Sequence, residues 1–161
     1  MAIRRMNHAV LYVRDAVRSA DFYRDVLGFR TVASFPGGEF LQAPDSTNDH
    51  DIAFFTIGAG AGPSAAGRST VGLYHLAWEV GTLTDLQELS VKLRDAGSLV
   101  GASDHGTTKA LYAQDPDGLE FEVCWVVPAD LLGDTAPSPR PLPLDIPAEL
   151  ARYGADTVGG R

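Results

Sequence analysis

The sequence predicts an α+β fold built from two βαβββ modules in tandem, and three observations carry this prediction. A short run rich in β-forming residues occurs twice, at 7–13 and 74–80, and each copy has a histidine in second place, His8 and His75. Each run is followed by a segment with apolar residues at helical spacing that ends near a glycine. Further β-like runs follow each of these segments. The same order of elements in both halves indicates a duplicated module.

The first module is predicted to cover residues 1–57. Its helix is expected over 16–29, where apolar residues recur at helical spacing and Gly28 can adopt the left-handed conformation that ends a helix. Three strands should follow, at Thr31–Phe35, Glu39–Ala43 and Ile52–Ile57.

The second module is predicted to cover residues 73–127. Its helix is expected over 83–97, with leucines on one face and Gly97 at the end. Strands are expected at Ser98–Gly101, Lys109–Gln114 and Leu119–Val127. The sequence DPDG between the last two is typical of a hairpin turn, because proline presets one turn dihedral and glycine supplies a positive φ.

Two segments lie outside the modules. Residues 58–72 are mostly Gly, Ala, Ser and Pro, which favours a linker over the alternative of a functional loop. Residues 128–161 hold six of the ten prolines, so 136–144 should be extended and irregular. A short helix is expected from Asp145 to Tyr153, ended by Gly154. This tail could cover the mouth of a site, pack on a second subunit or be loosely attached, and the sequence does not rank these roles.

Composition excludes several classes of function. The net charge of −8 argues against nucleic acid or an anionic membrane as a partner. No segment is apolar enough to predict a membrane span, and the first residues read as a strand rather than a signal peptide. One cysteine, Cys124, excludes an intramolecular disulfide and favours a reducing cytoplasm. Cys124 itself is expected to be a buried structural thiol.

Three residues are candidate metal ligands: His8, His75 and Glu122. Each is placed on or beside a predicted strand, where side chains alternate between two faces, so all three can point away from the apolar face. Two imidazoles and one carboxylate with open coordination positions form the ligand set of non-haem Fe(II) oxygenases. The alternative is two hydrogen-bonded histidines and a solvated carboxylate. Glu120, on the same face as Glu122, is expected to be a rim carboxylate.

The paired histidines, the helix motif FYRDVLGF and the hairpin motif DPDGLEFE resemble the vicinal oxygen chelate superfamily. This superfamily includes glyoxalase I, extradiol dioxygenases, fosfomycin-resistance transferases, epimerases and bleomycin-resistance proteins. The resemblance covers about residues 3–127 and is strongest for small extradiol catechol 2,3-dioxygenases. It implies paired modules that form a curled, cup-shaped mixed sheet around a metal site, bound by His8, His75 and Glu122. The expected metal is Fe(II), with Mn(II), Ni(II) and Zn(II) as alternatives.

The same resemblance implies roles for further residues. His50, just before the last strand of the first module, matches the acid–base histidine of extradiol enzymes, and imidazole exchanges protons near neutral pH. His105 would line the pocket, and Tyr112 would place its hydroxyl beside the metal. The alternatives are a polar loop residue for His50, a loop histidine for His105 and a core aromatic for Tyr112. Lys109 is expected to be a solvated cation at a strand edge.

The leading hypothesis is therefore a cytoplasmic Fe(II)-dependent extradiol dioxygenase that opens a small aromatic diol with O2. The runner-up is another metal-dependent member of the superfamily, such as a glyoxalase-type lyase, an epimerase or a thiol transferase. Glyoxalase I takes a fourth ligand from the last strand of its first module. Here that strand has no Glu or His, although Asp51 stands at its entrance. A third hypothesis is a metal-free, bleomycin-resistance-like binding protein. A homodimer is expected from the resemblance alone.

Overall fold

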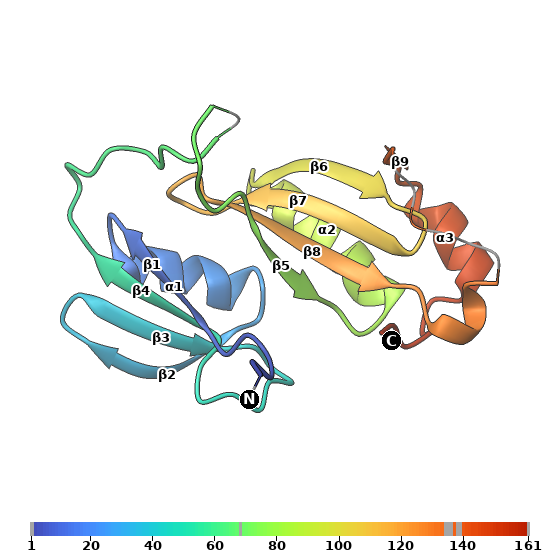
Figure 1. The fold of residues 1–161 in the computed structure, drawn as a ribbon, viewed down its shortest axis with the longest axis horizontal. Coiled ribbons are helices and arrows are strands. Elements are labelled where there is room, and N and C mark those ends of the chain that lie inside the picture. The colour runs from blue at the N-terminus through green and yellow to red at the C-terminus, as the bar shows by residue number, and fades with distance from the viewer. Residues whose placement is uncertain (1, 68, 134–136, 138–139, 161) are drawn as a thin grey trace. The chain divides into compact units, whose positions relative to one another are not determined.

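The computed structural model describes residues 2–67, 69–133, 137 and 140–160. The chain divides into two compact units, whose elements are labelled in Figure 1. One unit comprises the residues up to Ser64 together with Pro116–Gly118. The other comprises Ala65–Asp115 and the residues from Leu119 onward. Each unit combines helix with a mixed sheet, which confirms the predicted α+β class.

The first unit is a four-stranded sheet with one helix. Its elements in chain order are β1 (Ala9–Val13), α1 (Ala16–Asp25), β2 (Arg30–Phe35), β3 (Gly38–Gln42) and β4 (Ile52–Thr56). The strand order is β1-β4-β3-β2, in which β1 and β4 are parallel and the other pairs are antiparallel.

The second unit repeats this arrangement. Its elements are β5 (Leu76–Glu79), α2 (Leu83–Asp95), β6 (Leu99–Asp104), β7 (Thr108–Gln114) and β8 (Glu120–Val126). The order β5-β8-β7-β6 has the same parallel first pair, and a short strand from the tail, β9 (Leu142–Pro143), extends the sheet beside β6. A bulge interrupts β2 between Thr31 and Ala33, and another interrupts β6 between Leu99 and Gly101. The duplication is therefore visible in topology and irregularities as well as in sequence, and neither sheet closes.

Local sequence explains where the two module helices begin and end. The Asp15 carboxylate accepts hydrogen bonds from the backbone N–H groups of Val17 and Arg18, which caps α1. At α2, Thr82 and Asp85 form a reciprocal capping box. Gly28 and Gly97 follow the two helices with φ values of 79° and 68°, a conformation that side chains with a Cβ rarely adopt.

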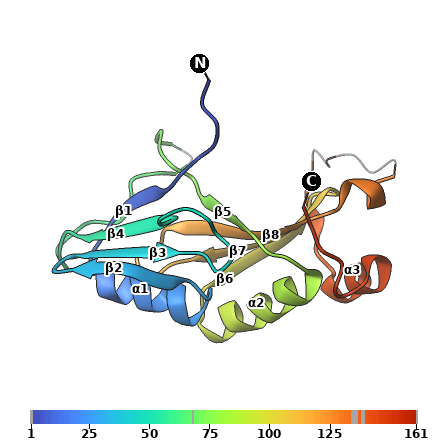
Figure 2. The ribbon, with the colours of Figure 1, turned by 90° about the horizontal axis from the view of Figure 1, so that it is seen from below.

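The core of each unit lies between its sheet and its helices (Figure 2). In β8, Phe121, Val123 and Trp125 are buried, whereas Glu122 on the alternate face is only partly covered. In β1, Val10 and Tyr12 are 50% and 74% exposed while Val13 is buried. The alternation predicted for both strands is therefore confirmed, and it places the candidate ligand Glu122 on the face away from the helices.

The tail folds back onto the second unit. It contains a 3-10 turn, η1 (Ala129–Leu131), then β9, then helix α3 (Ile146–Tyr153), which Asp145 caps and Gly154 ends, as the sequence predicts. Of the segment 136–144, residues 136, 138 and 139 lie outside the described residues. The prediction of irregular structure is wrong for Leu142 and Pro143, which pair with Asp104 and Ser103 of β6.

Strand β6 is longer than predicted, because its polar end, Ser103 and Asp104, pairs with β7 on one side and β9 on the other. Within the described part of the chain, no helix has the length and apolar character needed to cross a membrane.

Candidate metal and catalytic site

The second unit brings two of the predicted metal ligands together. His75 immediately precedes β5, and Glu122 lies on β8, the parallel neighbour of β5. Nε2 of His75 and Oε2 of Glu122 are 3.2 Å apart, and the two side chains are 24% and 13% exposed. His75 and Glu122 are far apart in the sequence, and the fold brings their side chains together at a partly buried position.

The donor geometry of this pair is compatible with a shared cation. Two ligands that each bind a metal at about 2.1 Å and at right angles are separated by about 3 Å, close to the observed separation. Nδ1 of His75 is buried and has no hydrogen-bond partner. A ring whose Nδ1 is already removed from solvent presents only Nε2 to a ligand. The chemistry and spacing of the pair therefore fit a divalent ion held by imidazole and carboxylate.

Tyr112 and His105 lie next to this pair. Tyr112 on β7 is directly opposite Glu122 on β8, and its ring makes an edge contact with His75 at 5.9 Å between centroids. Its hydroxyl lies 2.9 Å from Nε2 of His105, which stands in the turn between β6 and β7. Burial, followed by the nearby Glu122 carboxylate, raises the pKa of Tyr112 to about 12. The phenol is thus a hydrogen-bond donor at neutral pH.

The first unit brings the other two histidines together. His8 directly precedes β1, and His50 lies at the end of the loop that leads into β4. Their rings are in contact at a tilt of 32°, with 4.3 Å between centroids, and Phe40 makes an edge contact with His50 at 5.1 Å. The amide oxygen of Asn7 accepts a hydrogen bond from Nδ1 of His8 at 2.7 Å. With Nδ1 as the donor of this bond, the lone pair of Nε2 of His8 is free, an arrangement common for metal-binding histidines.

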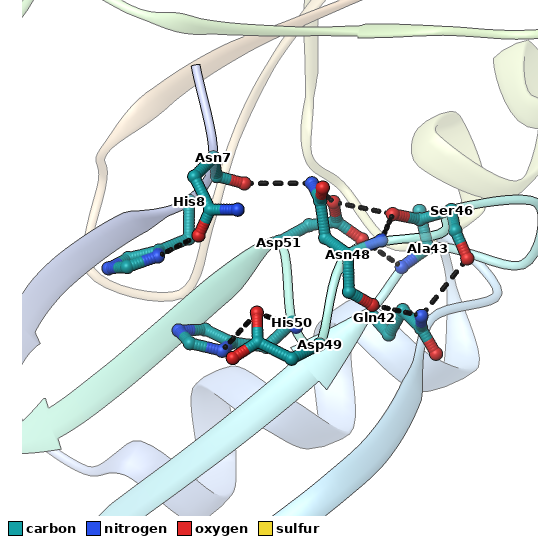
Figure 3. Close-up of polar contacts among 9 residues, drawn as sticks. All are labelled: Asn7, His8, Gln42, Ala43, Ser46, Asn48, Asp49, His50 and Asp51. Carbon is teal, nitrogen blue, oxygen red and sulfur yellow. Dashed lines mark hydrogen bonds and ion pairs between the residues drawn. The ribbon is translucent and has the colours of Figure 1, made fainter. Parts of the chain in front are cut away.

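A hydrogen-bond network orders the loop of residues 43–51, which carries His50 (Figure 3). Its centre is the Asp51 carboxylate, which accepts bonds from the backbone N–H of Ala43 at 2.8 Å and the Ser46 hydroxyl at 2.8 Å. The Asn48 side-chain amide also donates to Asp51 at 2.7 Å, and it donates to the Asn7 carbonyl at 2.8 Å. The loop is thereby tied to the residue that precedes His8.

This network changes the expectation for Asp51. Both of its carboxylate oxygens accept bonds from loop donors, so its role in the structure is to shape the loop. This observation counts against Asp51 as the fourth metal ligand that the resemblance to glyoxalase I would imply. The backbone N–H of His50 donates to the Asp49 carboxylate and lowers its pKa, with the charge of His50 adding to the effect.

Two further residues have clear outcomes. The expectation for Lys109 is wrong: its side chain is fully buried and forms ion pairs with Asp104 at 2.6 Å and Glu149 at 3.0 Å. The tail helix supplies Glu149, and no local sequence pattern predicts this contact. Cys124 is a buried free thiol, as predicted, and burial followed by the Glu122 charge raises its pKa to about 12.

The complete ligand triad stays a prediction. His75 and Glu122 belong to the second unit and His8 belongs to the first. Among the residues that the structure describes, no group of three or more His, Cys, Asp or Glu side chains is arranged to hold a metal ion. The structure therefore brings the candidate ligands His75 and Glu122 together in one unit, and it brings the rings of His8 and His50 together in the other.

Comparison with known families agrees with this fold. The model of the Glyoxalase/Bleomycin resistance protein/Dioxygenase superfamily matches residues 5–123. The chain belongs to this superfamily. The match ends before the tail, so helix α3 lies outside the matched residues.

Curated relatives within the superfamily are enzymes of two kinds. Biphenyl-2,3-diol 1,2-dioxygenase 3 of Rhodococcus globerulus is 36% identical over 120 residues, which cover 74% of this chain and 62% of that protein. Catechol-2,3-dioxygenase of Bacillus subtilis is 32% identical over 124 residues, covering 73% and 40%. A probable lactoylglutathione lyase of Synechocystis is 30% identical over 125 residues, covering 72% and 91%. The chain thus spans less than two thirds of the two dioxygenases. These relatives support an enzymatic role.

Solved structures confirm the fold. A glyoxylase/bleomycin resistance protein/dioxygenase domain from Frankia has a TM-score of 0.64 at 22% identity, covering 80% of this chain and 96% of that one. A mutant of the fosfomycin resistance protein FosX from Listeria monocytogenes, complexed with Mn(II) and 1S,2S-dihydroxypropylphosphonic acid, has a TM-score of 0.57 at 18% identity. This match covers 76% of the present chain and 90% of the FosX chain.

Proposed function

We propose that the protein is a metal-dependent extradiol dioxygenase that opens the ring of a catechol-like substrate with Fe(II) and O2. The observation that carries the proposal is the pair formed by His75 and Glu122, which lies beside the Tyr112 ring at a partly buried position. Two of the curated relatives are ring-diol dioxygenases, and their similarity supports this reaction over others in the superfamily. A cytoplasmic location and a homodimer remain part of the proposal.

His75, Glu122 and His8 are the residues that would hold the metal. When bound there, Fe(II) would supply Lewis acidity toward the diol and the electrons for O2 chemistry. The Asn7 amide oxygen would keep Nε2 of His8 directed away from Asn7 and free to coordinate.

His50 and Tyr112 are the residues that would handle protons and orient the substrate. The His50 ring, held between His8 and Phe40, would take a proton from a substrate hydroxyl. Tyr112 lies directly opposite Glu122, and its phenol would donate a hydrogen bond to a substrate oxygen. When Nε2 of His105 donates to the phenol oxygen, the Tyr112 hydrogen is left free for that bond.

The test is metal analysis of protein purified without O2, followed by O2 uptake with catechols and added Fe(II). We expect bound iron, O2 consumption and a yellow ring-opened product. Glu122→Gln should lose iron and turnover, whereas the matched control Glu120→Gln, on the same strand and face, should keep both. His50→Ala should keep iron and lose about 10²-fold or more in turnover. Unchanged turnover in His50→Ala would rule out its assigned role.

A second candidate function is a metal-dependent lyase of the lactoylglutathione type. The observation that favours it is similarity to the probable lactoylglutathione lyase of Synechocystis, which is 30% identical to this chain over 125 residues. Tightly bound metal without O2 uptake, together with lactoylglutathione formation from methylglyoxal and glutathione, would establish it. Protein without any metal would instead favour a binding protein of the bleomycin-resistance type.

A further inference from the structure

The tail meets the second unit at the two residues that frame the turn of His105. Asp104 ends β6 and Lys109 lies near the start of β7, and the two are cross-strand partners. On the backbone side, Leu142 of β9 pairs with Asp104. On the side-chain side, Glu149 of α3 lies 3.0 Å from the ammonium group of Lys109. Two separate tail elements therefore converge on one hairpin end.

Lys109 connects the tail to this turn. Its ammonium group is fully buried, donates to Oδ1 of Asp104 at 2.6 Å and lies 5.7 Å from the ring centre of Tyr153. Its contact with Glu149 has the geometry of a charge contact rather than of a hydrogen bond. A buried cation needs compensating charge, and removing one partner of such a group is strongly unfavourable. Asp104 and Glu149 together supply the negative charge that compensates the buried Lys109.

Asp104 in turn shapes the turn that carries His105. The same Oδ1 that accepts from Lys109 also accepts from the backbone N–H of Gly106 at 2.7 Å. The backbone N–H of His105 donates to the carbonyl of Thr108 at 2.9 Å, which closes the turn. Nε2 of His105 then reaches the Tyr112 hydroxyl at 2.9 Å. A continuous series of contacts therefore runs from α3 to Tyr112, entirely within the second unit.

Described residues that follow α3 also contact the second unit. Nε1 of Trp125 donates to the Thr157 carbonyl at 3.2 Å, and the N–H of Gly160 donates to the Val126 carbonyl at 3.0 Å. A Cβ on Gly159 would lie 2.7 Å from Nε1 of Trp125, so only glycine permits this close approach. In Figure 2, α3 lies on the same side of the five-stranded sheet as α2.

We propose that the C-terminal tail orders part of the site. Glu149 of α3 holds the turn that positions His105 against Tyr112, and it does so through the buried Lys109 and Asp104. Glu149, Lys109 and Asp104 are positioning residues. Their effect on catalysis rests on the proposed function, whereas their effect on the turn does not. The proposal assigns a role to a segment that the superfamily pattern does not include.

The test is amide hydrogen exchange of the protein without metal or substrate, measured by NMR in Glu149→Gln. We expect the amides of His105 and Gly106 to exchange at least about tenfold faster, while core amides of α2 and β8 keep their rates. Glu88→Gln, the same charge change at an exposed position of α2, is the matched control and should leave the turn unchanged. The conservative variant Glu149→Asp should restore part of the protection, and it also serves if Glu149→Gln does not fold.

Two results would overturn the proposal. One is unchanged exchange at His105 and Gly106 in a folded Glu149→Gln protein. The other is faster exchange spread evenly over the second unit, because the tail would then contribute only general stability. Where the unchanged protein opens catechols, Glu149→Gln should also lose turnover while it keeps its metal. Absence of ring cleavage in the unchanged protein would reject the proposed function, and the exchange measurement would still decide the role of the tail.

Discussion

Replacing Asp51 by asparagine should loosen the loop of residues 43–51. The carboxylate accepts three hydrogen bonds, from the Ala43 backbone, the Ser46 hydroxyl and the Asn48 amide, and all three are 2.7–2.8 Å long. An asparagine side chain offers only one oxygen, so at least one of these donors must face an NH2 group. A donor left unsatisfied in a partly buried position costs about 1–3 kcal/mol, and we expect a loss of about 2 kcal/mol in the free energy of unfolding.

The assay is equilibrium unfolding in urea followed by circular dichroism, combined with hydrogen exchange at the Ala43 amide. Tryptophan fluorescence is less suitable, because Trp78 and Trp125 both lie in the second unit. Asp45→Asn is the matched control: it makes the same charge change at an exposed position of the same loop and should shift stability by less than about 0.5 kcal/mol. An Asp51→Asn protein as stable as the control, with normal protection at Ala43, would refute the reasoning.

Three further predictions concern the site. Burial raises the pKa of Tyr112 to about 12 from an ordinary value of 10, so the stability due to its neutral form is complete below pH 10 and is lost as the pH rises toward 12. Urea unfolding from pH 9 to 12 should show this loss of stability. In Tyr112→Phe, the loss of stability over the same pH range should be smaller. The pKa of Cys124 is also raised to about 12, so this thiol should react with a thiol reagent at pH 8 only after the protein unfolds. Rapid labelling of the native protein would contradict the burial of Cys124. Asn7→Ala should weaken the proposed metal binding by about 10-fold or more, because His8 loses the hydrogen-bond partner of its Nδ1. Competition with a chelator measures this affinity. An unchanged affinity would mean that Asn7 does not orient His8.

Much of the fold followed from local sequence. Gly28, Gly97 and the DPDG turn mark ends of elements that depend on backbone conformation, and the structure places positive φ values at Gly28, Gly97 and Gly118. The alternation in β8 separated Glu122 from its buried neighbours, because strand geometry fixes which side chains share a face. These features need only neighbouring residues, so sequence reasoning reached them.

The polar network around His50 could not be predicted in the same way. The loop sequence DSTNDHD is rich in residues that form turns, but nothing in it shows that Asn48 reaches the Asn7 carbonyl or that Asp51 gathers three donors. A carboxylate near a strand entrance could equally have been a metal ligand. Which donors surround it depends on how β1 and β4 pair.

Sequence by itself determined that this chain is a duplicated βαβββ protein with histidines before matching strands and a carboxylate after a hairpin. Such features repeat along the chain and are set by residues close to one another. Only the tertiary structure decided that Lys109 is buried rather than solvated and that the tail reaches the turn of His105. The reason is that the sequence around Lys109 is the same whether or not a distant carboxylate lies close enough to neutralise its charge. Burial of a charge becomes favourable only once Asp104 and Glu149 have been brought together around it.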